Sequence, residues 1–240
     1  MALSEWASPA QNPEAARSSH ELVYASRALY MKQFETLQRQ FAGTTLSKAV
    51  LSRIIHDPRI TIQDAIPLYR EMLKQYPRAM VYLACLPDGS CWMGASPELL
   101  LRVNGAMAYT TSVAATQSGK RTDSNAWNQK EKTEQQIVTD YIYALLQKYG
   151  VEGVETQGPK TYQAGNVWHL RTNFAFPAHY LHTHTDQFLT ELHPTPAVCG
   201  TPKQQAYEVL MQTEPHDREF YAGFLGPVGI SNKLDLFVNL

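Results

Sequence analysis

The sequence has few cysteines, almost no net charge and no long apolar run. Cys85, Cys91 and Cys199 include no CxxC pair, so we expect neither a disulfide framework nor a thiolate zinc site. Reduced thiols, as in the cytosol, fit this usage best. The 21 basic and 22 acidic residues leave a formal net charge of −1. Nucleic-acid-binding proteins usually carry a basic face, so we expect no nucleic-acid partner.

A membrane signal is also missing. No apolar run approaches the roughly 20 residues that a transmembrane helix needs. Residues 1–19 are rich in Ala, Ser and Pro and lack the apolar segment of a signal peptide. We therefore expect a cytoplasmic monomer without a membrane partner, in which residues 1–19 are a loose lead-in and residues 20–240 form one domain.

The spacing of apolar and turn residues predicts both helices and tightly connected strands. Asn104-Gly105 is typical of a hairpin turn. Strands joined by tight turns and interspersed with separate helices indicate an α+β fold, with antiparallel sheets and flanking helices. Helices are expected over residues 21–41, 62–75, 124–149 and 186–192, and Thr201-Pro202 opens another, with Pro202 at its first helical position. Strands are expected over residues 48–53, 80–86, 91–95, 99–103, 106–113, 166–176, 220–229 and 233–240.

The ends of two elements carry further signals. Asp123 or Ser124 is a suitable cap for the long helix, and Gly150 suits the position after its end. Apolar residues alternate from Leu234 to Leu240, which predicts a strand with one buried face. This strand stops without a turn residue or a polar tail, so we expect a domain whose C-terminal portion is missing.

One carboxylate lies on an otherwise apolar helix face. Glu134, Val138, Tyr141 and Leu145 are spaced at i, i+4, i+7 and i+11 and therefore share that face. A carboxylate in an apolar site is costly unless it is paired or binds a metal. A metal ligand, a salt bridge to a lysine one turn away and simple exposure near the helix start all remain open for Glu134.

Two further ionisable residues adjoin apolar strands. Lys48 begins a strand of otherwise apolar character, and burial would lower its pKa enough for it to act as a general base. Glu98 lies between Ser96-Pro97 and Leu99, where it could be held protonated as a general acid. Taken alone, each residue is better explained in a simpler way: Lys48 as an edge lysine with its charge in solvent, and Glu98 as a loop glutamate that caps a strand.

Two other groups of residues suggest binding sites. Gly200 precedes Thr201-Pro202-Lys203 at a helix start, where backbone amides favour anions, although an ordinary helix start explains the pattern too. The pair His182 and His184, with His179 nearby, would share one face of a strand and could hold a metal. No third ligand accompanies this pair, which favours a surface loop.

Six segments occur in an order that resembles the chorismate-binding enzymes. This family includes isochorismate synthase, salicylate synthase, and component I of anthranilate and aminodeoxychorismate synthases. The resemblance covers about residues 46–240 and implies an anthranilate synthase component I-like fold, incomplete in this chain. The segments are Lys48-Ala-Val-Leu-Ser-Arg53, Gly94-Ala-Ser-Pro-Glu-Leu-Leu100, Lys130-Glu-Lys-Thr-Glu134, Trp168-His-Leu170, His193-Pro-Thr-Pro-Ala-Val-Cys-Gly-Thr-Pro-Lys203 and Asp217-Arg-Glu-Phe-Tyr-Ala-Gly223.

Within this family, the chain is most similar to isochorismate synthase, of the menaquinone or siderophore pathways. Ala197 stands where ammonia-using members usually have threonine, and Lys48 matches the lysine of water-using members. The resemblance implies that chorismate is the substrate, that Lys48 activates water for addition at C2, and that Glu98 protonates the departing C4 hydroxyl. It also implies Mg²⁺ as cofactor with Glu134 as one ligand. The substrate contacts implied are Ala115, Thr116, His169, Ala197, Gly200 and Tyr221.

The sequence departs from the family pattern in several places. Ala115 replaces a glycine, and Gln135 replaces the histidine that usually follows the metal glutamate. Family members also continue past the strand at 233–240 with an arginine, a second metal glutamate and a lysine, and they carry more sheet before Lys48. A truncated, catalytically impaired homologue is therefore one alternative. A salicylate synthase, and an aminating component I that needs a glutamine amidotransferase partner, are two others.

Overall fold

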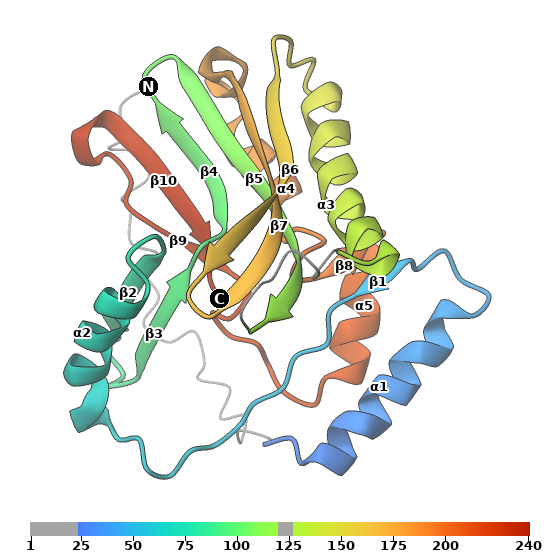
Figure 1. Ribbon diagram of the computed structural model, residues 1–240, viewed down its shortest axis with the longest axis vertical. Coiled ribbons are helices and arrows are strands. Elements are labelled where there is room, and N and C mark those ends of the chain that lie inside the picture. The colour runs from blue at the N-terminus through green and yellow to red at the C-terminus, as the bar shows by residue number, and fades with distance from the viewer. Residues whose placement is uncertain (1–23, 120–126) are drawn as a thin grey trace.

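A computed structural model of the chain describes residues 24–119 and 127–240. The expected lead-in at 1–19 and the expected helix caps Asp123 and Ser124 lie outside the described residues. The fold combines antiparallel sheets with flanking helices, as the sequence predicts (Figure 1).

A six-stranded antiparallel sheet forms the centre of the fold. Its strand order is β6-β7-β5-β4-β10-β9. Long strands β5 and β7 pair from Met107↔Pro177 to Ser118↔Val167, with a register shift between Ala114 and Thr116. The strands are β4 (Leu99–Asn104), β5 (Met107–Ser118), β6 (Glu155–Ala164), β7 (Val167–Pro177), β9 (Phe224–Leu225) and β10 (Lys233–Val238).

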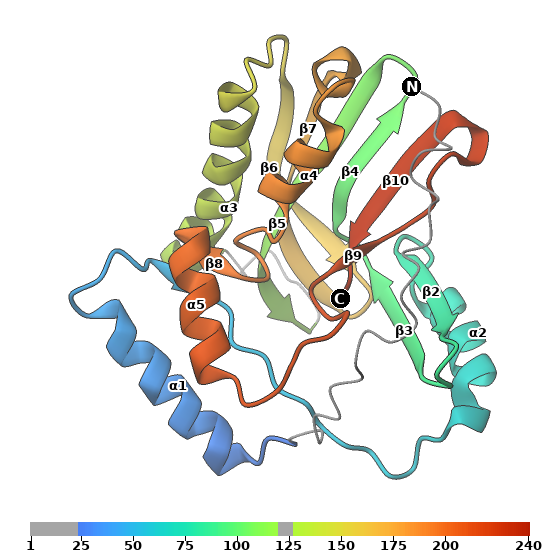
Figure 2. The same cartoon turned by 180° about the vertical axis from the view of Figure 1, so that it is seen from behind.

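Helices α3 (Gln129–Lys148) and α4 (Thr185–Leu192) bury their apolar faces against this sheet. Figure 2 shows α4 in front of the sheet and α3 beside it. Phe174, Phe176 and Phe188 are at most 1% exposed in the core between these layers. A core of this kind stabilises the sheet because each buried aromatic ring removes a large apolar area from water.

The long helix starts later than expected and ends where expected. It begins at Gln129, because the side chain of Asn128 accepts a hydrogen bond from the Glu131 backbone and caps the helix. The expected start at residue 124 is therefore wrong. Gly150 follows the C-cap with a φ of 64°, a left-handed conformation that suits glycine.

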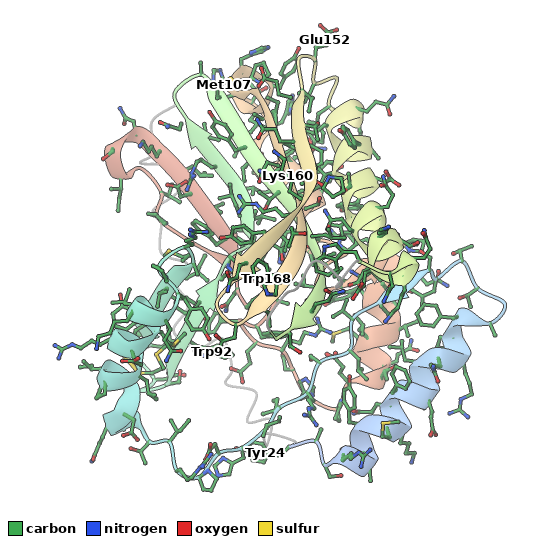
Figure 3. The ribbon with its side chains drawn as sticks, in the orientation of Figure 1. Tyr24, Trp92, Met107, Glu152, Lys160 and Trp168 are labelled. Atoms are coloured by element: carbon green, nitrogen blue, oxygen red, sulfur yellow. A yellow bond between two sulfur atoms is a disulfide. The ribbon has the colours of Figure 1, made fainter. Side chains whose placement is uncertain are left out.

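A hairpin of β2 (Met80–Cys85) and β3 (Cys91–Ser96) packs against α2 (Ala65–Gln75), which the short 3₁₀ helix at Ile62–Asp64 precedes. Trp92, labelled in Figure 3, meets the Phe220 ring edge-on at 5.4 Å between ring centroids. Cys85 and Cys91 stand directly opposite each other and form a disulfide. The expectation of reduced thiols is therefore wrong for this pair. The register of the hairpin brings the two cysteines together although they are six residues apart and form no CxxC motif. Cys199 is free and buried.

A second layer carries the segment of Lys48. Helices α1 (Arg27–Phe41) and α5 (Lys203–Thr213) enclose the short strands β1 (Lys48–Ala49) and β8 (Gly200–Thr201). A Cβ on Gly200 would lie 2.1 Å from the carbonyl oxygen of Lys48, so only glycine permits this close pairing. The buried residues of this layer are Leu37, Leu46, Cys199, Ala206 and Leu210.

Several expected boundaries are wrong for identifiable reasons. The strand at 48–53 shortens to β1, because side chains of Glu214 and Arg218 bind its later backbone groups. The strand at 220–229 shortens to β9, because Ala222 and Gly226 adopt positive φ on either side of it. Helix α1 starts after Ser26, which is its cap, and α5 starts at Lys203 with Pro202 as its cap.

Strand β6 was not expected from the sequence. It is the exposed edge of the main sheet and has a mostly polar sequence, so it shows no apolar alternation. His179, His182 and His184 are exposed on and after the 3₁₀ helix Ala178–Leu181, so the expected strand that pairs two of their rings is not formed. Among the described residues, no helix is both long and apolar enough to cross a membrane.

Candidate active site

One cavity of about 560 Å³ collects residues from distant parts of the sequence. It lies where β5 and β7 approach the loop that precedes α5, near Trp168 at the lower end of β7 in Figure 3. The predicted site residues that line this cavity are Glu98, Ala115, Thr116, Glu134, His169, Ala197 and Tyr221. Lys48 and Gly200, also predicted, are not among the lining residues.

Glu98 is a buried carboxyl group at the cavity wall. It sits in the turn between β3 and β4, where the Ser96 hydroxyl accepts a hydrogen bond from its backbone N–H. Its side chain is removed from water and accepts one hydrogen bond from the Thr195 hydroxyl at 3.3 Å. Burial raises the pKa of Glu98 to about 7, against the opposing effects of Thr195 and Lys48. Near neutral pH this carboxyl group can therefore hold and release a proton.

Lys48 forms an ion pair with Glu134, which lines the cavity. The Lys48 Nζ lies 3.4 Å from Glu134 Oε1, with side chains 11% and 35% exposed. Burial lowers the pKa of Lys48, whereas the Glu134 and Glu98 carboxylates partly restore it. Nζ makes no hydrogen bond to any residue that the structure describes. Glu134 therefore has a lysine partner from a distant segment, and not one turn away on its own helix.

The opposite wall contains a bulge in β5. Ala115 lies in the register shift of this strand with a φ of 57°, a conformation that glycine adopts more easily. Thr116 Oγ1 and His169 Nδ1 lie 3.2 Å apart across the β5–β7 pair. Burial lowers the pKa of His169, which favours a neutral imidazole.

The loop between α4 and α5 closes the cavity beside Glu98. Within it, the Ala197 N–H donates to the Thr195 hydroxyl at 3.3 Å, so one threonine orders both the loop and the carboxyl group. His193 Nε2 lies 2.7 Å from the Ala222 carbonyl oxygen and links this loop to the segment that carries Tyr221.

Three contributors escaped the sequence interpretation. Arg218 donates to the carbonyl oxygens of Val198 and Val50 at 2.8 and 2.6 Å, and so braces two cavity-lining segments. It is paired with Glu214, four residues earlier in the chain, in the non-helical segment that follows α5. Thr195 was given no role although it lies in the motif that begins at His193, and Arg78 lies outside the six motifs.

The site offers few oxygen donors for Mg²⁺. No cluster of three or more His, Cys, Asp or Glu side chains suited to a metal occurs in the described ranges. Glu134 offers one carboxylate at the cavity rim, and magnesium sites often use only one or two carboxylates, completed by water and substrate. Glu134 thus fits as one ligand but does not make a metal site by itself. The neighbouring Gln135 points into the core, where its Nε2 donates to Ser112 Oγ at 2.9 Å.

Comparison with known proteins defines the class of this fold. A protein assigned as the 2,3-dihydroxybenzoate-specific isochorismate synthase DhbC of Bacillus anthracis superposes with a TM-score of 0.74 at 26% identity, over 90% of this chain and 61% of that chain. Anthranilate synthase component I of Streptococcus pneumoniae shares the fold at 20% identity, with a TM-score of 0.70 over 89% of this chain and 48% of that chain.

The sequence comparison identifies the family. The family model described as chorismate binding enzyme matches residues 2–240, so the chain belongs to that family. Isochorismate synthase EntC of Escherichia coli strain K12 is 31% identical over 208 residues, which are 80% of this chain and 52% of that protein. Isochorismate synthase MenF of Bacillus subtilis is 27% identical over 208 residues, 82% of this chain and 43% of that protein. The chain spans about half the length of the curated relatives it matches.

Proposed function

We propose that this chain takes part in the conversion of chorismate to isochorismate, by adding water at C2 and releasing the C4 hydroxyl. The observation that carries the proposal is that Glu98 and Glu134 line one cavity and that Lys48 pairs with Glu134 at 3.4 Å, close enough to Glu98 for their charges to interact. The pKa values of Lys48 and Glu98 move in opposite directions, as a general base and a general acid require. Membership of the family and the names of its relatives support the choice of substrate.

Lys48 is the base of the proposed reaction. Its buried Nζ has a lowered pKa, so a larger fraction is uncharged at neutral pH than for a lysine in water. The uncharged amine accepts one proton from a water molecule while the water oxygen bonds to C2. The Glu134 carboxylate, 3.4 Å away, stabilises the ammonium that results.

Glu98 is the acid. Its carboxyl group gives one proton to the C4 hydroxyl, which leaves as water while the ring double bonds shift. One water enters and one water leaves, so the reaction is an isomerisation without oxidation or reduction. Proton exchange with solvent then returns Lys48 and Glu98 to their starting states. The pKa of about 7 lets Glu98 be reprotonated near neutral pH.

The remaining lining residues would orient the ring. Thr116 and neutral His169 present hydrogen-bonding groups on the β5–β7 wall, and Tyr221 faces the cavity from the opposite segment. Glu134 is the residue that would hold Mg²⁺, together with substrate and water oxygens. The bound ion would neutralise a substrate carboxylate.

The test is an assay with chorismate and magnesium that detects isochorismate, run on the wild type and on Lys48→Ala. Loss of a general base costs about 10²- to 10⁴-fold in rate. Lys32→Ala removes an exposed lysine on α1 and is the matched control, which we expect to retain full activity. Equal rates for Lys48→Ala and the wild type would refute the proposed base.

Other products would identify the alternative functions. Salicylate with pyruvate would indicate a salicylate synthase, and an ammonia-dependent amino product would indicate an aminating component I. A wild-type chain that unfolds cooperatively but converts no chorismate would identify an impaired homologue.

A further inference from the structure

Within the described part of the chain, the cavity lining contains one arginine and no lysine. That arginine is Arg78, the lining carboxyl side chains are Glu98 and Glu134, and Leu240, which carries the terminal carboxylate of this sequence, lines the cavity too. Lys48 is not among the lining residues, and its charge is paired with that of Glu134. Arg78 is the one cationic side chain of the described lining, and no carboxylate side chain of the described residues forms an ion pair with it. A guanidinium at a cavity wall attracts an anionic ligand.

A contact between the end of α2 and the β6–β7 turn holds the segment of Arg78 at the cavity. The residue follows Tyr76-Pro77, which end α2. The Tyr76 ring covers Gly165 in the β6–β7 turn so closely that a Cβ on this glycine would lie 2.3 Å from Tyr76 Cε1. This contact joins the segment that carries Arg78 to the turn of the main sheet, and both segments line the cavity.

Arg78 forms no side-chain interaction with a described residue, whereas Arg171 and Arg218 do. Arg171 lies 4.7 Å from the centre of the Tyr162 ring and donates to Asn173 at 2.7 Å, and Arg218 is paired with Glu214. Arg78 is exposed and has no ion pair or side-chain hydrogen bond with any described residue. Its donors therefore face solvent at the cavity mouth without an internal partner.

We infer that Arg78 binds a carboxylate of a ring substrate that carries two carboxylates. The identity of that substrate as chorismate rests on the proposed function. A guanidinium presents paired N–H donors that match the two oxygens of a carboxylate, and such charge-assisted pairs bind more strongly than neutral hydrogen bonds. One end of the substrate is then held by Arg78, while the reacting ring atoms face Lys48 and Glu98.

Calorimetric titration at low ionic strength tests this inference. The probes are chorismate and isophthalate, an unreactive ring with two carboxylates. We expect Arg78→Gln to weaken binding of both probes by roughly ten- to one-hundred-fold. Arg78→Lys retains the charge but loses the paired donors, so its affinity should be intermediate. Arg70→Gln removes an exposed arginine from α2 outside the cavity, with the same change in net charge, and should bind like the wild type.

The outcomes separate this inference from the proposed function. If the wild type binds chorismate and Arg78→Gln binds it equally well, the inference is wrong and the proposed function stands. If isophthalate binding depends on Arg78 but chorismate is neither bound nor converted, the inference stands and the proposed function fails. Failure of the wild type to bind either probe overturns both. Unchanged unfolding midpoints confirm that the variants are folded.

Discussion

Glu98→Gln is expected to change how the stability of the protein depends on pH. Burial raises the pKa of Glu98 from 4.5 to about 7, so the folded state holds this proton more tightly than the unfolded state. This contribution to stability is fully present below pH 4.5, and it is lost as pH rises through about 7. A shift of this size corresponds to roughly 3 kcal/mol of stability.

The measurement is the free energy of unfolding by denaturant at pH 5 and pH 8. Glutamine has a similar shape but does not titrate. Part of the effect is already lost at pH 5, which lies above the unfolded pKa, so the wild type should lose roughly 2.5 kcal/mol more than Glu98→Gln between these values. Glu152→Gln changes an exposed glutamate, labelled in Figure 3, and should follow the wild type. Parallel pH dependences for Glu98→Gln and the wild type would refute the assigned burial of an ionisable carboxyl group.

Two further predictions concern the scaffold of the site. Arg218→Met removes one partner of a buried ion pair and leaves Glu214, whose side chain is 5% exposed, without its charge partner. We expect it to lower the free energy of unfolding by about 3–5 kcal/mol, and a loss below about 1 kcal/mol, as surface pairs give, would contradict this. Ala115→Gly relieves a positive φ and should be neutral or stabilising by up to about 1 kcal/mol. Ala114→Gly, at the neighbouring strand position, should be destabilising by about 0.5–1 kcal/mol. Equal decreases in the melting temperatures of the two variants would argue against the bulge at Ala115.

Local signals in the sequence located many elements correctly. Asn104-Gly105 marks the turn between β4 and β5, and the alternation from Leu234 marks β10, because both patterns arise from neighbouring residues. The same logic failed where long-range contacts decide the structure. Polar β6 forms a strand because β7 offers it a partner, and the strand expected at 48–53 ends early because a distant arginine occupies its backbone oxygen.

The disulfide could have been predicted from the hairpin that the sequence indicates. The sequence predicts the hairpin of residues 80–95, and that hairpin places Cys85 opposite Cys91. The pairing follows from strand register rather than from a cysteine motif. The same reasoning applies to Thr116 and His169, which become neighbours only through the register of β5 and β7.

The sequence by itself determined the order of the motifs and the kinds of groups available for chemistry: a lysine at 48, carboxyl groups at 98 and 134, and a family resemblance that the comparison confirms. Only the tertiary structure decided which of these groups meet and how each is charged. Burial depends on packing between segments far apart in the chain, and burial sets the pKa of Glu98. The free guanidinium of Arg78 follows equally from folding, because only the assembled cavity shows which charges already have partners.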